Sequence, residues 1–296
     1  MPLTRLRVEI SSAFNLFLGG GSLRLNNLSD ESYCETLEER NRKLLRDRVL
    51  VTGVSGAVGR AVAELLLSSS IDVVGIDRRD PDDALDLSTS PDASFRWIKA
   101  DISNPSELAD IGRELRDREP LSGIVCAAGI EGPAGSLLSI DDDDFAHVMN
   151  VNVTAQFLCM KYLVPALRHD GRGSIVMVGS TSGALGNAGA GAYVTSKHAV
   201  VGLTRAAAVD LAPLGIRVNC VAPGPLETPL MAAFEQSHDG ASRIREWYES
   251  NTPLRRYGTV EEVAQVISFL LSSQASFITG GVYLCDGGLT ASGRIV

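Results

Sequence analysis

The sequence lacks any hydrophobic run long enough to cross a membrane. A transmembrane helix needs about 18 or more consecutive apolar residues, and no segment of the 296-residue chain approaches that length. The apolar stretch at residues 13–18 is shorter than a typical secretory signal and is followed by three glycines. These absences predict a cytoplasmic protein with no membrane partner.

Paired cysteines are also absent. The chain has five cysteines and no C-x-x-C motif, and two of the five, Cys126 and Cys220, fall in apolar runs. Scattered cysteines of this kind predict buried free thiols, and neither a disulfide framework nor a metal site.

Positive charge is scarce. The 27 Lys and Arg residues face 36 Asp and Glu residues, so the formal net charge is −9. An acidic surface binds polyanions poorly, and the sequence therefore predicts no nucleic-acid partner.

What the sequence does contain is a regular alternation of strands and helices that begins near residue 46. Apolar runs predict strands at 49–51, 71–76, 95–99, 124–127, 174–178, 217–221 and 282–285. Helical patterns lie between them, at 56–67, 105–118, 142–168, 192–212 and 261–271. Such alternation is typical of a parallel sheet with helices on both faces. The predicted fold class is α/β, a Rossmann-type doubly wound parallel sheet of about seven strands in a single domain, residues 46–296.

Residues 1–45 stand outside this pattern. They contain a short alternating stretch, three consecutive glycines and a charged segment that ends near Lys43. Two interpretations stay open for this N-terminal extension: a flexible arm, or an arm that packs on a neighbouring subunit.

The first predicted strand runs into a glycine-rich turn, G-V-S-G-A-V-G, from Gly53 to Gly59. At the start of a helix, such a turn lets backbone N–H groups approach a pyrophosphate. Asp77 ends the next strand, where a carboxylate can hold ribose hydroxyls and repel a 2′-phosphate. The pattern predicts NAD(H) in preference to NADP(H). Arg78 and Arg79 keep NADP(H) open, because a guanidinium can pair with that phosphate.

A second group of residues has the chemistry of proton transfer. Tyr193 and Lys197 stand four residues apart at a predicted helix start and so share a face. Ser180 follows a buried strand, and the carboxyl ends of parallel strands line the ligand crevice. A tyrosine has an ordinary pKa near 10, and a nearby ammonium favours its phenolate form. We therefore expect these three side chains to converge at the crevice.

In the order and spacing of these motifs, the chain from about residue 45 to 290 resembles the short-chain dehydrogenase/reductase family. Ser180, Tyr193 and Lys197 match the family's catalytic residues, and Asn152, in V-N-V-T, matches its catalytic asparagine. The resemblance implies an NAD(P)-dependent alcohol dehydrogenase or ketoreductase that interconverts a secondary alcohol and a ketone by hydride transfer. Tyr193 would be the general acid and base, and Asn152 would hold a water that returns a proton to Lys197.

The same resemblance assigns cofactor contacts along the chain. Asp101-Ile102 matches the pair near the adenine ring, and the segment that begins at Pro223 matches the one near the nicotinamide. Together with the glycine turn, the predicted cofactor-binding residues are Gly53, Ser55, Gly56, Val58, Gly59, Asp77, Arg78, Asp101, Ile102, Ala128, Gly129, Tyr193, Lys197, Pro223, Gly224, Leu226 and Thr228. The resemblance further implies a homotetramer or homodimer, with helices 142–168 and 192–212 in the main interface.

Residues 225–253 are predicted to cover the substrate site. This lid segment is rich in apolar and aromatic residues, which favours an apolar or cyclic alcohol or ketone as the small-molecule substrate. The alternative that these side chains only pack the lid onto the domain stays open. Candidate substrate contacts are Glu131, Ser182, Asn187 and Met231.

The glycine turn departs from the family's single-domain branch, because Ala57 stands where that branch has glycine. The spacing G-x-x-G-x-x-G is typical of the extended branch of sugar-nucleotide epimerases and dehydratases. Only about seventy residues follow Pro223, too few for that branch's substrate domain. Two alternatives stay open: a non-catalytic NAD(H)-binding regulatory protein, and an epimerase or dehydratase of the extended branch.

Overall fold

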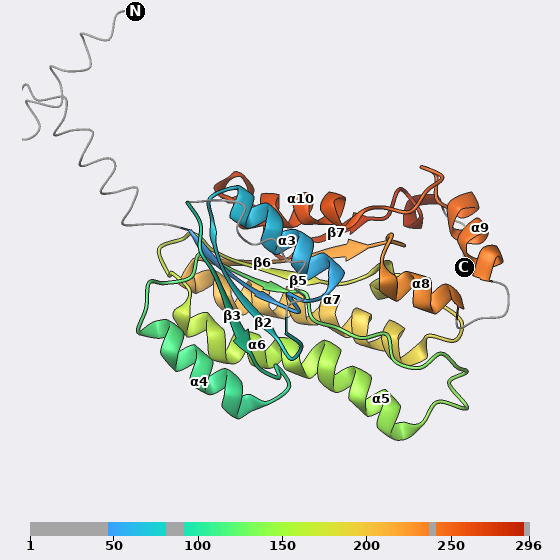
Figure 1. Cartoon of the computed structure of the whole chain (residues 1–296), viewed down its shortest axis with the longest axis horizontal. Coiled ribbons are helices and arrows are strands. Elements are labelled where there is room, and N and C mark those ends of the chain that lie inside the picture. The colour runs from blue at the N-terminus through green and yellow to red at the C-terminus, as the bar shows by residue number, and fades with distance from the viewer. Residues whose placement is uncertain (1–46, 81–91, 237–240, 293–296) are drawn as a thin grey trace, which may run out of the picture. The chain divides into compact units, whose positions relative to one another are not determined.

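The computed structural model of the chain describes residues 47–80, 92–236 and 241–292, so the prediction for residues 1–45 lies outside the described residues. Seven parallel strands form one sheet in the order β3-β2-β1-β4-β5-β6-β7 (Figure 1). The strands are β1 Arg48–Thr52, β2 Asp72–Asp77, β3 Phe95–Lys99, β4 Gly123–Cys126, β5 Gly173–Val178, β6 Ile216–Pro223 and β7 Val282–Cys285. The predicted Rossmann-type α/β fold is confirmed.

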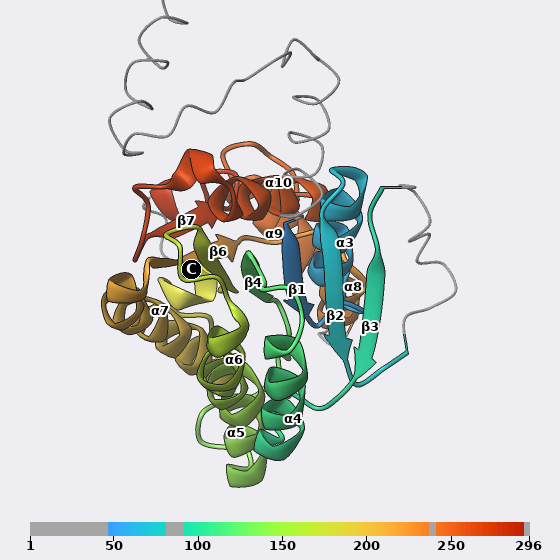
Figure 2. The ribbon, with the colours of Figure 1, turned by 90° about the vertical axis from the view of Figure 1, so that its left-hand side faces the viewer.

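Helices cover both faces of this sheet, α3 and α10 on one and α4, α6 and α7 on the other (Figure 2). The α-helices are α3 Ala57–Ser68, α4 Pro105–Arg116, α5 Asp142–Met149, α6 Ala155–Leu163, α7 Gly191–Leu211, α8 Pro229–Gln236, α9 Ala241–Asn251 and α10 Val260–Leu271. Among the described residues, no helix combines the length and the apolar character that membrane crossing requires.

The alternating direction of strand side chains builds two cores from the same strands. Leu50 and Ile124 point toward α4, α6 and α7, whereas their neighbours Val51 and Val125 point toward α3 and α10. All four side chains are fully buried. Because both faces of the central strands are covered, these strands are apolar at nearly every position, which is the pattern visible in the sequence.

The strand order reverses between β1 and β4. From β1 the chain continues to β2 and β3 on one side, and from β4 it continues to β5, β6 and β7 on the other. In an open parallel sheet, ligands bind outside the carboxyl ends of the strands at such a switch point. The turn after β1 and the turn after β4 are therefore the positions where a ligand site is expected.

The prediction of one continuous helix over residues 142–168 is wrong. It consists of α5, a π-helical segment at Asn150–Thr154, and α6, followed by a 3₁₀ turn at Val164–Ala166. Pro165 lies in that turn, and proline cannot continue the hydrogen-bond pattern of the preceding helix. The α-helical region therefore ends before Arg168.

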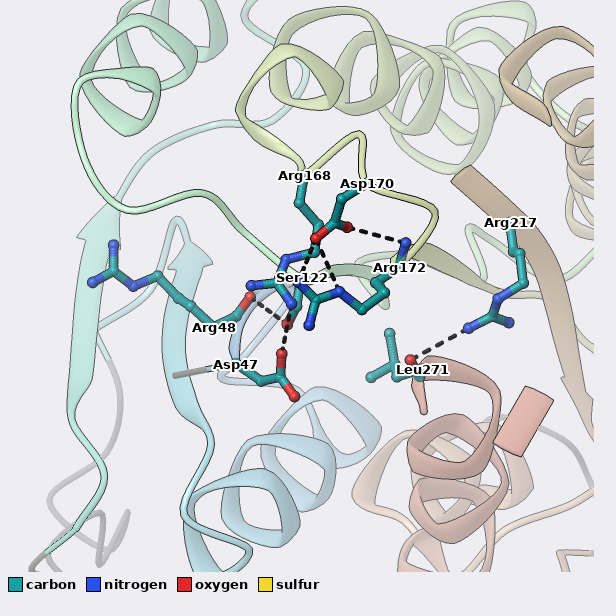
Figure 3. Close-up of polar contacts among 8 residues, drawn as sticks. All are labelled: Asp47, Arg48, Ser122, Arg168, Asp170, Arg172, Arg217 and Leu271. Carbon is teal, nitrogen blue, oxygen red and sulfur yellow. Dashed lines mark hydrogen bonds and ion pairs between the residues drawn. The ribbon is translucent and has the colours of Figure 1, made fainter. Parts of the chain in front are cut away.

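Arg168 belongs instead to a polar group at the amino-terminal edge of the sheet (Figure 3). Its side chain is buried, and its Nη1 pairs with Asp47 Oδ1 at 3.1 Å. Nearby, Ser122 Oγ donates to Arg48 O at 3.1 Å. On β6, Arg217 donates to carbonyl oxygens at the end of α10, including Leu270 O at 2.8 Å. A cation is favourable at a helix C-terminus, and these contacts secure the edge opposite the expected ligand site.

Candidate active site

The glycine turn between β1 and α3 contains one position that only glycine adopts readily. Gly53 has a φ of +69°, and its N–H donates to Ile76 O at 2.8 Å. A Cβ on Gly53 would lie 2.6 Å from Ala128 Cα, and a Cβ on Gly59 would collide with the Gly53 carbonyl oxygen. Gly56 has φ −84° and ψ 158°, an extended conformation open to any residue. The close packing of turn, strand and helix therefore depends on Gly53 and Gly59.

This geometry explains the unusual glycine spacing. Ala57 is the first residue of α3, directly after the Gly56 N-cap. The Gly56 N–H closes the turn by donating to Gly53 O at 2.9 Å. The two tight contacts lie elsewhere in the turn, so an alanine at the start of the helix is accommodated.

Asp77, at the end of β2, is nearly buried and fixed by backbone donors. Its Oδ2 accepts from the Ser55 N–H at 3.0 Å, and its Oδ1 accepts from the Arg79 N–H at 3.0 Å. The Arg78 side chain is 59% exposed and lies 3.8 Å from an Asp101 carboxylate oxygen. The turn after β1 thus holds the Asp77 carboxylate at the mouth of the switch point, with arginine side chains beside it.

A cleft of about 820 Å³ lies along the carboxyl ends of β1, β2, β3 and β4. This volume is within the range of small-molecule and cofactor sites. The predicted cofactor-binding residues that line it are Gly53, Gly56, Asp77, Arg78, Asp101, Ile102, Ala128 and Gly129. Close backbone approach at Gly53 and a fixed carboxylate at Asp77 fit the pyrophosphate and ribose of a dinucleotide.

The cleft extends toward the predicted catalytic lysine. A Cβ on Gly129, in the turn after β4, would lie 3.2 Å from Asn152 Oδ1 and 3.6 Å from Lys197 Nζ. Glycine at this position leaves the space between the cleft and these two side chains open. The cleft and the predicted proton-transfer residues are therefore contiguous.

Tyr193 and Lys197 lie one turn apart at the start of α7, with Lys197 Nζ 5.4 Å from the centroid of the Tyr193 ring. Lys197 is 4% exposed, and its Nζ donates to Val178 O at 3.0 Å. Burial raises the pKa of Tyr193 to about 12, against a hydrogen bond with Ser180 that lowers it. Burial also lowers the pKa of Lys197 to about 8. Desolvation thus moves each group toward its neutral form.

Ser180 reaches Tyr193 because a tight turn follows β5. Its Oγ accepts from the Ser182 N–H at 3.1 Å, which caps the 3₁₀ turn Thr181–Gly183. Ser182 Oγ in turn accepts from Asn187 Nδ2 at 2.9 Å. These contacts connect two predicted substrate residues, Ser182 and Asn187, to the Ser180 backbone turn.

Asn152 lies in the π-helical segment and is completely buried. Its Nδ2 donates to Ile130 O at 2.7 Å and to Ser196 Oγ at 2.9 Å, and its Oδ1 accepts from the Ile130 N–H at 2.8 Å. The side chain therefore ties the loop after β4 to α7, one residue before Lys197. Its predicted role in holding a water stays a prediction.

The other predicted residues are not among those that line the cleft. Ser55, Val58 and Gly59 belong to the turn and to α3, Pro223 ends β6, and Gly224, Leu226 and Thr228 follow it. Thr228 Oγ1 accepts from the N–H of Met231, the fourth predicted substrate residue, at 3.2 Å. The contacts of these residues with cofactor or substrate stay predictions.

The predicted lid carries α8 and α9, and Arg245 on α9 joins α9 to the first part of the lid and to Tyr257, which lies just after it. Arg245 donates to both carboxylate oxygens of Glu227, at 2.8 and 2.9 Å. Its guanidinium lies 4.4 Å from the centroid of the Tyr257 ring, and the Tyr257 hydroxyl donates to Glu235 at 2.6 Å. The lid is therefore joined to the segment next to the predicted nicotinamide contacts.

Two parts of the site are missing from the sequence predictions. Of the loop after Gly129, residues 130–134, only Glu131 was predicted, although the whole loop lines the cleft. The glycine and proline that follow the buried strand β4 in this loop were a usable signal. Tyr248 on α9 adds to the rise in the pKa of Tyr193, of which burial is the largest cause. No sequence pattern indicates that effect.

The aspartate run at 141–144 opens a helix. Asp141 Oδ1 accepts from the Asp143 N–H at 2.9 Å and caps α5. Within the part of the chain that the structure describes, no three His, Cys, Asp or Glu side chains are grouped to hold a metal ion.

Comparison with known proteins identifies the family. A family model described as enoyl-(acyl carrier protein) reductase matches residues 53–290. The chain is 36% identical to 2,5-dichloro-2,5-cyclohexadiene-1,4-diol dehydrogenase of Sphingobium indicum, over 82% of this chain and 96% of that protein. It is 35% identical to cyclohexanol dehydrogenase of an Acinetobacter species, over 82% and 94% of the two chains.

Solved structures agree with this assignment. Levodione reductase superposes with a TM-score of 0.78 at 31% identity, covering 83% of this chain and 98% of the other. An NAD⁺-bound xylitol dehydrogenase (TM-score 0.76, 27% identity, 82% and 98% coverage) and an NADPH-bound form of ElxO (0.75, 29%, 83% and 100%) are also similar. The chain therefore belongs to the short-chain dehydrogenase/reductase family of oxidoreductases.

Proposed function

We propose that this oxidoreductase interconverts a cyclic secondary alcohol and its ketone, with NAD(H) as cofactor and Tyr193 as proton donor and acceptor. The observation that carries the proposal is the cluster of Ser180, Tyr193 and Lys197 beside a cleft at the strand-order reversal. The names of the related cyclohexanol and cyclohexadienediol dehydrogenases and of levodione reductase support a cyclic substrate.

Each side chain has a part in moving one proton. Ser180, which lowers the pKa of the Tyr193 phenol, would hold the substrate oxygen next to that phenol. In reduction, Tyr193 donates its proton to that oxygen, and in oxidation it accepts the proton. The Lys197 ammonium stabilises the phenolate that remains after donation. When the cofactor is bound, its nicotinamide supplies or accepts the hydride. The glycine turn, Asp77 and Gly129 would hold the cofactor.

The preference for NAD(H) rests on Asp77. Its carboxylate is 11% exposed and directed by two backbone N–H groups, so a 2′-phosphate placed there would meet a fixed negative charge. Arg78 and Arg79 are exposed on the same turn and are the groups that would favour NADP(H) instead. We expect NADH to bind at least tenfold more tightly than NADPH in fluorescence titrations, and tighter NADPH binding would reverse the assignment.

The decisive experiment replaces the proton donor. Tyr193→Phe removes the hydroxyl and keeps the ring, so we expect kcat for ketone reduction to fall by about 10³-fold or more while NADH affinity changes little. Absorbance of NADH measures turnover, and fluorescence measures binding. Turnover within tenfold of wild type would contradict the proposed role of Tyr193. Absence of turnover in the wild-type protein across a panel of cyclic alcohols and ketones would favour the non-catalytic NAD(H)-binding alternative.

The extended-branch alternative receives no support from the relatives named above, which are dehydrogenases and reductases. Those relatives are matched over 94% or more of their own length, so the comparison leaves little room for an added sugar-nucleotide domain in them. The glycine spacing that motivated this alternative has a local explanation in the contacts of Gly53 and Gly59.

A homotetramer or homodimer is the proposed assembly, through α5–α6 and α7. Phe157 on α6 is 47% exposed and Val209 on α7 is 74% exposed. Apolar side chains of this size on two neighbouring helices support an interface with a second copy. The described cysteines are all free thiols, which supports a reducing compartment such as the cytoplasm.

A further inference from the structure

The two ends of the predicted lid are joined to each other by the backbone. Leu226, after β6, and Gly258, before α10, form an isolated parallel bridge. The Glu227 N–H donates to Gly258 O at 3.0 Å, and the Gly258 N–H donates to Pro225 O at 3.0 Å. Tyr257, next to Gly258, is 3% exposed. We call residues 225–227 and 257–258 the lid base; α8 and α9 lie between its two halves in the chain, at the carboxyl end of the sheet (Figure 1).

Arg245, on α9, contacts the lid base at two points. Its guanidinium donates to both carboxylate oxygens of Glu227, at 2.8 and 2.9 Å. Its Cζ lies 4.4 Å from the centroid of the Tyr257 ring. A guanidinium that meets a carboxylate through two parallel hydrogen bonds fixes orientation as well as distance, and the aromatic face adds a further attraction. These contacts therefore fix the orientation of α9 on the lid base.

Glu235, at the end of α8, connects the other lid helix to the same guanidinium. It is 8% exposed and accepts from the Tyr257 hydroxyl at 2.6 Å, and its Oε1 lies 3.4 Å from Arg245 Nε. A nearly buried carboxylate is costly without a cation and hydrogen-bond donors beside it. Removing the charge of Arg245 would therefore weaken its contact with the lid base and its contact with α8 together.

The lid base adjoins the residues that the reaction would use. Glu227 directly precedes Thr228, a predicted cofactor contact. On α9, Tyr248 lies three residues after Arg245. Burial is the largest cause of the raised pKa of Tyr193, and Tyr248 adds to the rise. A change in the position of α9 would therefore change the surroundings of the predicted proton donor.

We propose that Arg245 is a positioning residue that, through Glu227, holds α9 over the substrate end of the site and so increases the affinity for the ketone. This inference rests on the proposed function, because it concerns binding of the same substrate. Arg245 acts through the lid and contacts neither substrate nor cofactor. A lid that is already in place spares the substrate the free energy of ordering it, so KM rises as the population of the ordered lid falls.

Arg245→Gln and Glu227→Gln each remove one charge of the pair. We expect Arg245→Gln to raise KM for cyclohexanone about tenfold and Glu227→Gln to raise it at least threefold, with kcat and the Kd for NADH changed less than threefold. The double variant should match Arg245→Gln, because both substitutions remove the same contact. In hydrogen-exchange mass spectrometry without substrate, the amides of α9 should exchange about tenfold faster in Arg245→Gln than in wild type.

Arg256→Gln is the matched control. Arg256 also donates to both oxygens of a carboxylate, those of Glu262 at 2.9 and 2.6 Å, but this pair lies at the start of α10 and does not include α9. The control should leave KM and the exchange of α9 unchanged. Unchanged α9 exchange in Arg245→Gln would overturn the inference, and so would faster exchange with an unchanged KM. Increases in KM that multiply in the double variant would also overturn it, because the two residues would then act separately.

Hydrogen exchange uses no substrate, so failure of the inference can be told from failure of the proposed function. If the wild-type protein turns over no cyclic ketone, the proposed function is wrong and the effect on KM is wrong with it. Faster α9 exchange in Arg245→Gln would then support only the contact between α9 and the lid base. If Arg245→Gln does not fold, as judged by thermal unfolding, Glu227→Gln decides the question, because the Glu227 side chain is 53% exposed.

Discussion

Burial shifts the pKa values of Tyr193 and Lys197 in opposite directions, and each shift favours the neutral form of its group. The pKa of Tyr193 is raised to about 12 and that of Lys197 is lowered to about 8, and burial is the largest cause of each shift. At neutral pH the phenol is therefore protonated, the form that donates in ketone reduction. Lys197 is still mostly charged at neutral pH, but its pKa of about 8 lies only about one unit above that pH. In the protein alone the phenol is thus held in its protonated form, and forming the phenolate requires further positive charge at the site.

These values predict how activity depends on pH. The ammonium of Lys197 is present below about pH 8 and is lost as the pH rises through that value, because the pKa is lowered. We expect kcat/KM for ketone reduction to be constant up to about pH 8 and to decline above it, approaching tenfold per pH unit. In Lys197→Arg, the guanidinium stays charged, and the decline should move upward or disappear. A wild-type profile that stays flat to pH 10 would contradict the role of Lys197.

The limits of sequence reasoning at this scale are visible in Asn152 and Tyr248. The residue type and position of Asn152 indicate a functional asparagine, but its contact with Ile130 depends on a loop that no local pattern specifies. Tyr248 is visible as one aromatic of the lid. Its effect on the pKa of Tyr193 depends on how α9 packs against the domain, which only the tertiary structure shows.

At the scale of elements, the turn between β1 and α3 makes a matched pair of glycine substitutions informative. Gly53→Ala places a side chain in a positive-φ position and against Ala128, so we expect a loss of about 2–4 kcal/mol in the free energy of unfolding. Gly56→Ala meets only Gly53 O at 3.2 Å in an ordinary conformation, so the change should be within about 1 kcal/mol. Urea unfolding of both variants measures the difference.

If Gly56→Ala were less stable than Gly53→Ala, the conformation of the turn would not depend on the positive φ of Gly53. Cofactor titration of Gly56→Ala gives a separate readout, because a methyl group there lies on the lining of the cleft. If Gly56→Ala binds NADH more weakly but unfolds at the same urea concentration, Gly56 is needed for cofactor binding and not for stability.

The strands were predictable because each of the central ones is buried on both faces and therefore apolar throughout. The helix predicted over 142–168 was only partly predictable. Its start at Asp142 follows from the capping aspartate, and Asp141 does cap it. The π-helical segment at Asn150–Thr154 leaves no signal in composition, because it differs from an α-helix only in its hydrogen-bond register.

At the scale of the whole molecule, the proposed assembly can be tested with two exposed apolar residues. Phe157→Asp and Val209→Asp each put a charge on a helix of the proposed interface, and we expect each to shift the protein to a smaller species. Light scattering coupled to size-exclusion chromatography measures the mass. Leu138→Asp, at a residue that is 98% exposed in the loop after β4, is the control. An unchanged mass in both interface variants would place the interface elsewhere or indicate a monomer.

Three thiols are completely buried in this fold, and their reaction with a thiol reagent can report unfolding. Cys126 and Cys159 on one side of the sheet, and Cys220 on β6, are each 0% exposed. A thiol reagent can reach them only when the surrounding structure opens. The rate at which these thiols are labelled therefore measures how often the native structure opens in buffer without denaturant. Mass spectrometry of partly labelled protein would distinguish local breathing, which modifies one thiol, from global unfolding, which modifies all three together.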